Sequence, residues 1–262
     1  MVAAGIIFLI IGVVLVVVHV LARRKEGRLV AARPFTSGEL ATVASTVAGE
    51  IGAGGFKQLA ELVGEADCAR PLQSPLGQVP CLYYSMRISR RYEEEYWERD
   101  QNGNQVRRTR SGTEIMSSES QGVDFDLVDH AGALRVRLQG ADFDGLRKTV
   151  DRFEPGGDGG GMRLQFGGFS MAIGTLGSGR RTLGYEYDES VLPVQGRLTV
   201  VGEVTDAHGG LSVGKGGEIF LVSTRSKAEM LGSARKTAKL TAAFSGICAA
   251  AGVVLLVLGL LK

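Results

Sequence analysis

The sequence predicts a mainly β domain, an antiparallel barrel-like structure, flanked by two transmembrane α-helices. Two long apolar runs, one at each end of the chain, predict the helices. Between them, short stretches of alternating apolar and polar residues separated by glycine-rich turns predict a closed or nearly closed antiparallel barrel. We therefore expect five segments: a transmembrane helix at 1–22, a basic juxtamembrane segment with a short amphipathic helix at 23–56, a β-rich domain at 57–224, a basic juxtamembrane helix at 225–239 and a transmembrane helix at 240–261.

The N-terminal apolar run is long enough for a membrane span, because a helix of about 20 apolar residues crosses the hydrocarbon core. His19 is its only strongly polar residue. A cleaved signal peptide would carry positive charge before a shorter apolar core. Here the basic residues Arg23, Arg24 and Lys25 follow the core instead, so we expect a retained helix. The C-terminal run contains no charged residue, which favours a second span over a buried core helix.

Basic residues gather on the inner side of both apolar runs. They are Arg23, Arg24, Lys25, Arg28 and Arg33 against Glu26, and Arg225, Lys227, Arg235, Lys236 and Lys239 against Glu229. Because basic residues near a span stay on the cytoplasmic side, we predict an integral two-pass protein with a cytoplasmic central domain and both termini outside. Such flanks also contact lipid headgroups, which makes the lipid bilayer a predicted partner.

The charge balance of the central region argues against nucleic acid as a partner. The whole chain carries a formal charge of +2, and each basic flank alone exceeds that value. The region at 34–224 is therefore acidic, whereas a nucleic-acid-binding domain shows a basic footprint of its own. We expect no nucleic-acid partner.

Local patterns place the first elements of the β-rich region. Thr36 followed three residues later by Glu39 fits a capping box and predicts a short helix that ends at the glycines after Ile51. Alternation predicts a strand from Leu82 that continues to Asp100, where Asn102-Gly103 marks a hairpin turn. The clearest hairpin joins alternating strands on either side of the turn at 129–132.

Candidate catalytic groups are weak. The stretch GGLSVGKG at 209–216 lacks the Ser or Thr after its lysine, and the following helix, that a phosphate-binding loop needs. His130 lies beside Asp124, Asp126 and Asp129, but alternation and ordinary turn chemistry explain these positions. Cys81 adjoins Pro80 on an apolar strand, where a cysteine usually packs. A membrane-tethered hydrolase using Cys81 or a metal at His130 is therefore only an alternative, and we expect no catalytic residue, metal or cofactor.

Three cysteines, Cys68, Cys81 and Cys248, do not make a disulfide framework, and we expect free thiols. The aromatic residues Tyr92, Tyr96 and Trp97 lie among four glutamates and form a candidate surface for an unknown protein partner. Ala242, Gly246 and Ala250 form a stripe of small residues in the second span, which makes a homo-oligomer through that helix conceivable.

Three stretches of the chain resemble a membrane-embedded ligase family called GIDE or Mulan. The resemblance covers roughly 57–224 and includes the flanking helices. Its motif residues in this sequence are Ser74, Pro75, Pro80, Cys81, Tyr83 and Tyr84, then Asp129 and Gly132, then Glu186, Pro193, Gly202 and Glu203. The resemblance implies a domain held between two membrane helices that binds partners or substrates beside the membrane. It also implies a location between organelle membranes, which differs from the cytoplasmic side that the local charges predict.

Family members with ligase activity carry a zinc-binding RING domain after the second helix. This sequence has three Cys and three His in total, too few ligands for the two tetrahedral zinc sites of such a domain. We therefore expect a membrane-anchored protein-interaction domain without catalysis of its own. The alternative is an E3 ubiquitin ligase that transfers ubiquitin, as the resemblance alone implies.

Overall fold

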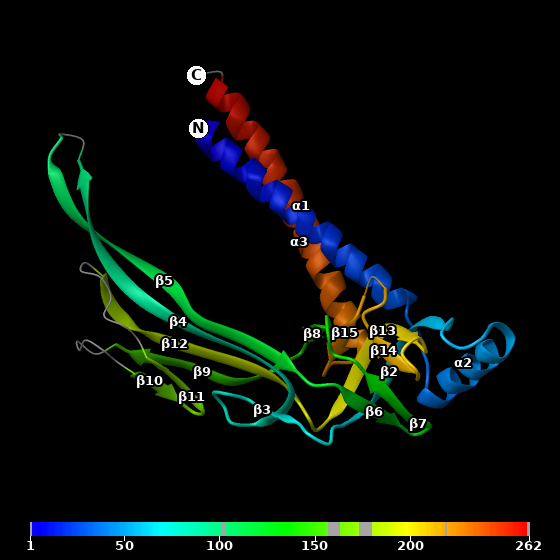
Figure 1. The fold of residues 1–262 in the computed structure, drawn as a ribbon. Coiled ribbons are helices and arrows are strands. Elements are labelled where there is room, and N and C mark those ends of the chain that lie inside the picture. The colour runs from blue at the N-terminus through cyan, green and yellow to red at the C-terminus, as the bar shows by residue number, and fades with distance from the viewer. Residues whose placement is uncertain (1, 101–102, 157–162, 173–179, 218, 261–262) are drawn as a thin grey trace.

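A computed structural model of the chain describes residues 2–100, 103–156, 163–172, 180–217 and 219–260. It has three parts: a pair of long helices, a small β-barrel at the base of that pair, and an extended sheet that projects from the barrel (Figure 1). The helices are α1 (Val2–Ala31) and α3 (Lys227–Leu260), and the shorter α2 (Ser37–Ile51) lies beside the barrel. The predicted fold class, a mainly β barrel-like domain between two apolar helices, is confirmed.

Five strands close the barrel: β2 (Lys57–Asp67), β6 (Phe125–Asp129), β7 (Gly132–Val136), β14 (Ser212–Gly214) and β13 (Arg197–Thr205). They pair in that order, and β13 returns to β2. The β7–β14 pair is parallel and the other four are antiparallel. Numbered along the chain, the order is first, second, third, fifth, fourth, which is the Greek-key order of OB-type barrels. Alternating side chains such as Leu62, Val136 and Val204 fill the interior.

Three short strands extend this sheet beyond the ring. They are β1 (Arg33–Pro34) on β2, β15 (Leu221–Ser223) on β13, and β8 (Asp142–Asp144) on β15. β15 leads directly toward α3, and β1 follows α1. Both membrane-type helices therefore enter the β domain through strands of one sheet.

The longest strands form a separate sheet that we call the arm. It contains β4 (Pro80–Arg99), β5 (Gln105–Gly122), β9 (Arg147–Pro155) and β12 (Arg180–Pro193), with the short β3 (Leu72–Gln73) beside β4. One face covers a second apolar core around Met86, Ile88 and Tyr187. The hairpin of β10 (Arg163–Phe166) and β11 (Phe169–Ala172) docks there, since Gly168 N–H donates to the Pro75 carbonyl at 2.9 Å.

The two hairpins expected from the sequence are confirmed. β4 and β5 pair antiparallel from Tyr83↔Gly122 out to Arg99↔Gln105. At their turn Asn102 lies outside the described residues, and Gly103 has a φ of 83°, the region that glycine tolerates. The β6–β7 hairpin closes between Asp129 and Gly132. The arm itself was not predicted, because alternation along a strand shows which faces are apolar but does not show which sheet the strand joins.

Helix α2 begins as the capping box predicts. Thr36 Oγ accepts from Glu39 N–H at 3.2 Å, and the Glu39 carboxylate accepts from Thr36 N–H at 2.8 Å. A second carboxylate holds this helix start to the barrel: Asp129 accepts from Ser37 N–H and from Ser37 Oγ–H, each at 2.7 Å. A negative charge at a helix N-terminus also interacts favourably with the helix dipole.

The pair of long helices packs through glycines. A β-carbon on Gly5 would lie 3.0 Å from the Gly252 carbonyl oxygen, and one on Gly252 would lie 2.9 Å from Leu9. Such close backbone approach is typical of helix pairs that associate without a hydrophobic driving force. His19, the polar residue of the first apolar run, lies with its Nδ1 2.8 Å from the Ala238 carbonyl of α3.

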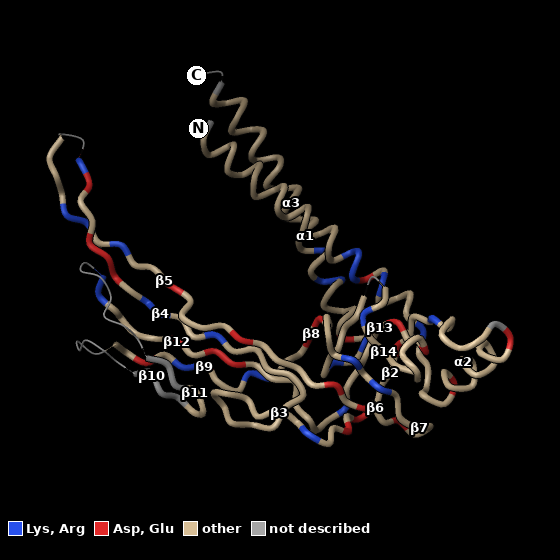
Figure 2. Tube along the Cα trace, viewed as in Figure 1, with Lys and Arg blue, Asp and Glu red and all other residues tan. Residues whose placement is uncertain are grey.

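Both long helices are apolar and long enough to cross a membrane, over Ala3–Ala31 and Lys227–Gly259. Apart from their contacts with each other and with the barrel, their apolar side chains are uncovered: Val13 and Ile247 are each 64% exposed. Charged residues appear only toward the barrel end of the pair (Figure 2). The stripe of Ala242, Gly246 and Ala250 is exposed and faces away from α1, since a β-carbon on Gly246 would meet nothing within 4 Å. Its role in oligomers therefore stays a prediction.

A small apolar cluster, which we call the junction, joins the helix pair to the barrel. It contains Leu29 and Ala32 of α1 and its exit, Met230 of α3, Val201 of β13, Leu221 of β15, and Ile219 in the segment before β15. Lys227 Nζ closes it by donating to the Ala32 carbonyl at 2.6 Å and to the Glu61 carboxylate at 2.9 Å. Arg235 and Glu26 add an ion pair at 2.8 Å between the two helices.

The Asp129 cap predicts an acid-sensitive α2. Burial raises the pKa of Asp129, but hydrogen bonds from Ser37, Ala131 and Gly132 outweigh it, so the pKa is lower than usual. A lowered carboxyl pKa gives stability that is present above the unfolded-state pKa and is lost as the pH falls through the folded-state value. Asp129→Ala should remove about 1–3 kcal/mol at neutral pH.

Thermal unfolding of the detergent-solubilised protein at neutral and acidic pH measures this effect. Asp126→Ala is the matched control, because Asp126 on the same hairpin forms an exposed ion pair with Arg135 and does not contact α2. An equal loss of stability in both variants at neutral pH would contradict the assignment to the cap.

Candidate binding sites

Cys81 does not have the environment of a nucleophile. It lies on β4 with no exposed surface, in the apolar core of the arm. Burial, and to a lesser degree the nearby Glu189 carboxylate, raises the pKa of its thiol to about 11. The thiol is therefore protonated at neutral pH, whereas a reactive cysteine needs the thiolate.

His130 has no metal-binding surroundings among the described residues. No group of three or more His, Cys, Asp or Glu that could hold a metal occurs in the part of the chain that the structure describes. His130 is exposed at the tip of the β6–β7 hairpin, and its neighbour Asp129 is occupied in capping α2. The hydrolase alternative therefore has no geometric support at either of its two residues.

The first family motif builds a tight turn before β4. Ser74 is buried, and its Oγ accepts from Val79 N–H at 3.2 Å. Glu189 of β12 holds this turn in place: its buried carboxylate accepts hydrogen bonds from Leu76 N–H at 2.7 Å and from Gly77 N–H at 2.9 Å. Thr149 Oγ also donates to Glu189 at 2.7 Å. Sequence reasoning missed Glu189, since an acidic residue in a strand gives no signal that it is buried.

The next motif residues attach the arm to its neighbours. Pro80 is the first residue of β4, where a strand can accommodate proline. The Tyr83 ring stacks on Phe143 with centroids 3.8 Å apart, and so joins the arm to the barrel sheet. Tyr84 is buried in the arm core, and its hydroxyl donates to Glu119 at 2.6 Å. Burial and then this hydrogen bond raise the Tyr84 pKa to about 12.

The remaining motif residues are also placed by packing. Gly132 has a φ of 149° and adjoins Ser37 at the start of α2. Glu186 forms an ion pair with Arg91 on the uncovered face of the arm, and Pro193 ends β12. A β-carbon on Gly202 would lie 2.8 Å from Phe220 and 3.0 Å from Val213, so only glycine fits there. The motif therefore marks how the fold is held together, with Glu203 as the exception.

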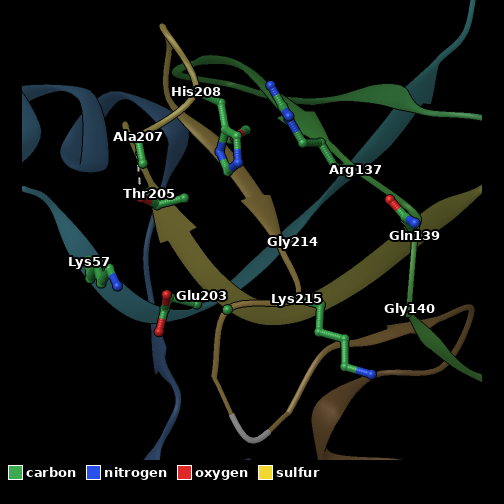
Figure 3. Close-up of a pocket in the computed structure, with 12 residues that line it drawn as sticks. Lys57, Arg137, Gln139, Gly140, Glu203, Thr205, Ala207, His208, Gly214 and Lys215 are labelled. Atoms are coloured by element: carbon green, nitrogen blue, oxygen red, sulfur yellow. Dashed lines mark hydrogen bonds between the residues drawn. The ribbon is translucent and has the colours of Figure 1, made fainter. Parts of the chain in front are cut away.

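Glu203 lines a hollow of about 600 Å³ on the outside of the barrel, which we call the barrel groove (Figure 3). Strand alternation turns Val204 and Val213 into the core, and turns Glu203 and Thr205 of β13 outward. The hairpin that carries His208 forms one wall, and the segment that carries Lys215 forms another. Residues from four strands or their ends meet there: Lys57, Arg137, Gln139, Gly140, Glu203, Thr205, Ala207, His208, Ser212, Gly214, Lys215 and Gly216.

Basic groups dominate the barrel groove. Lys57, Arg137 and Lys215 form no ion pair within the described part of the chain, and His208 stands exposed at the rim. The single carboxylate, Glu203, lies against the glycine turn beyond β14: a β-carbon on Gly216 would lie 2.1 Å from its Oε1. Three unpaired cations around one hollow suit an acidic ligand group. This arrangement of cations suits the binding of such a group.

The aromatic residues predicted as a partner surface lie on the outer half of the arm but not on one face. Tyr92 and Tyr96 share a face with cations above their rings: Arg180 lies 4.7 Å from the Tyr92 centroid, and Arg110 lies 5.5 Å from that of Tyr96. Trp97 points to the opposite face, since successive residues of a strand alternate, and it is 67% exposed. The three aromatic residues are therefore divided between two faces of the arm, and their role in binding stays a prediction.

The comparison with protein families gives one match. The family model GIDE, described as E3 ubiquitin ligase, matches residues 93–259, from the outer half of β4 to the end of α3. The motif residues from Asp129 to Glu203 lie within the matched range, and those from Ser74 to Tyr84 precede it. No curated protein and no solved structure matches the chain.

The buried state of Cys81 predicts selective labelling of thiols. In the folded protein at neutral pH, a water-soluble maleimide should modify Cys68, which is partly exposed, and should leave Cys81 unmodified. Denaturant should expose Cys81 and remove the difference. Trypsin does not cleave the Arg70–Pro71 bond, so both residues lie on one peptide, and tandem mass spectrometry localises the label to Cys68 or Cys81. Cys81 labelling in the native protein at the rate of Cys68 would contradict its assignment as a packing residue.

Proposed function

Because this chain belongs to the GIDE family of E3 ubiquitin ligases, we propose that it is a membrane-anchored domain that binds a protein partner and supplies no catalytic group of its own. The two apolar helices insert in a bilayer as a pair. The basic residues at their barrel ends favour the cytoplasmic side for the β domain and the outside for both chain termini. The partner is thereby held at the membrane surface, where a family concerned with ubiquitin transfer would need its substrate.

The barrel groove is the observation that carries this proposal. Lys57, Arg137 and Lys215 come from three different strand ends and surround one hollow. Within the described residues they form no ion pair, and Glu203 is the single carboxylate of the lining. Cations that form no ion pair contribute little to the stability of the fold, but they bind carboxylate or phosphate groups well. We assign this groove to an acidic segment of the partner protein.

The arm is a second candidate surface, favoured by a different observation. β5 pairs with β4 along its whole length, and its other edge has no strand beside it within the described residues. An uncovered strand edge is a template for an added strand from another chain. Trp97 of the adjacent strand is the most exposed aromatic side chain in the exposed apolar set, and aromatic anchors dominate binding energies.

Site-specific photocrosslinking distinguishes the two surfaces. A photoreactive amino acid replaces His208 at the groove rim in one protein and Trp97 on the arm in another. Each protein is expressed as the full chain in membranes and irradiated there. Adducts from the His208 position that disappear with Arg137→Glu, but persist with the control Arg70→Glu, would support the groove.

Arg70→Glu reverses the same charge as Arg137→Glu. It serves as the control because Arg70 is exposed and does not line the groove. Adducts from position 97 alone would move the binding site to the arm. The absence of any protein adduct at both positions would contradict the proposed function. Reactivity toward a membrane-impermeant reagent at His208→Cys, in sealed and in opened cells, measures the sidedness of the domain.

A further inference from the structure

A groove at the level where the helix pair leaves its apolar segment has the composition of a phospholipid site. Two adjoining hollows, of about 410 and 310 Å³, share Leu21 and Lys25 of α1. Together we call them the interfacial groove. The apolar run of α1 ends at Ala22 and the basic residues begin at Arg23. The groove therefore crosses the boundary between the apolar and the charged part of the helix.

The larger hollow suits a headgroup. Arg24, Lys25 and Arg28 of α1 line it together with Asp142 of β8. Leu21, Lys25 and Arg28 follow one another at spacings of four and three residues, so they share a face of the helix. The guanidinium and ammonium groups of this face are suited to the oxygens of a phosphodiester.

The smaller hollow suits an acyl chain. Val18, Leu21 and Ala22 of α1 line it opposite Met230 and Ala234 of α3. Ser233 and Thr237 of α3, Lys25 and Asp144 complete the lining, and most of its surface is apolar. It extends from Lys25 back along the pair toward the segment that is long and apolar enough to cross a membrane. Charge is therefore concentrated at one end of the interfacial groove and apolar surface at the other, in the order of a lipid headgroup and its tail.

Carboxylates beside these cations narrow the class of headgroup. Asp142 lines the larger hollow and Asp144 lines the smaller one, and both project from β8. A headgroup with only negative charge would meet these carboxylates unfavourably. A headgroup that carries a phosphate and a primary ammonium matches both signs, because the ammonium donates hydrogen bonds to carboxylates whereas a quaternary choline has no N–H.

We propose that the interfacial groove binds a phospholipid of the phosphatidylethanolamine type, with its phosphate at Arg24, Lys25 and Arg28 and its ammonium at Asp142 or Asp144. The inference rests on the proposed membrane anchorage of the helix pair. The bound lipid would fill the space between α1, α3 and β8, and so would fix the height of the β domain above the bilayer.

The test uses the full chain, reconstituted in bilayers that contain equal amounts of phosphatidylcholine, phosphatidylglycerol and phosphatidylethanolamine. The protein is then extracted in mild detergent, and native mass spectrometry measures the lipids retained. We expect phosphatidylethanolamine to be enriched severalfold over its bulk share. Arg24→Gln should abolish the enrichment, and Asp142→Asn should reduce the preference for phosphatidylethanolamine over phosphatidylglycerol.

Arg23→Gln is the matched control. It removes the same charge from the neighbouring residue, but Arg23 pairs with Glu26 at 3.2 Å and does not line the interfacial groove. Soluble phosphoethanolamine, which has the headgroup without the acyl chains, should not displace the retained lipid. Displacement by it would overturn the acyl-chain assignment.

Three further outcomes would overturn the proposal: retention in bulk proportions, stronger retention of phosphatidylglycerol, or an equal loss in Arg23→Gln and Arg24→Gln. Extraction of membranes with alkaline carbonate distinguishes a failure of the lipid-site proposal from a failure of the proposed membrane anchorage. A protein that leaves the membrane in carbonate would contradict the anchorage itself. A protein that stays without selective lipid retention would contradict only the lipid site.

Discussion

The apolar junction between the helix pair and the barrel positions every other feature of this molecule. Leu29, Met230 and Leu221 bring α1, α3 and the barrel sheet into one small core, and Lys227 ties the start of α3 to the exit of α1 and to Glu61 of β2. Burial of such side chains contributes roughly 1.5–3 kcal/mol each, enough to make the connection a packed interface instead of a flexible linker. Because the helices enter the β domain through this contact, the barrel groove and the interfacial groove have fixed places relative to the apolar segments.

Most motif residues of the family hold the fold together, whereas most candidate binding residues line the two grooves. Ser74, Asp129 and Gly202 lie where a turn, a helix start and a close packing contact require them. The cations of the two grooves lie outside the motif, on strand ends and on one face of α1. Glu203 connects the sets, since it belongs to the motif and lines the barrel groove.

The sequence predicts the local structure well because local chemistry determines it. The Thr36–Glu39 capping box, the turn at Gly103 and the two apolar runs each appear as expected. The division of the strands into a barrel and an arm could not be predicted, because partner choice depends on contacts far apart in the chain, such as the stacking of Tyr83 on Phe143. The barrel groove was missed for the same reason: Lys57, Arg137 and Lys215 have no spacing that relates them. Tyr96 and Trp97, adjacent in sequence, face opposite sides of a strand, so the residues of the predicted aromatic surface lie on two faces of the arm.

The membrane anchorage that we propose places the helix pair in lipid and leaves the β domain in water at the surface. Nitroxide labels at Val13, Ile247 and Ala207 of the reconstituted full chain test it, because their collision rates with oxygen and with a polar nickel chelate report the surrounding phase. We expect labels at Val13 and Ile247, whose side chains are exposed in the structure, to collide mainly with oxygen, and a label at Ala207 in the barrel groove to collide mainly with the chelate. Ready collision of the chelate with labels at Val13 and Ile247 would show the apolar helices in water and would contradict the account.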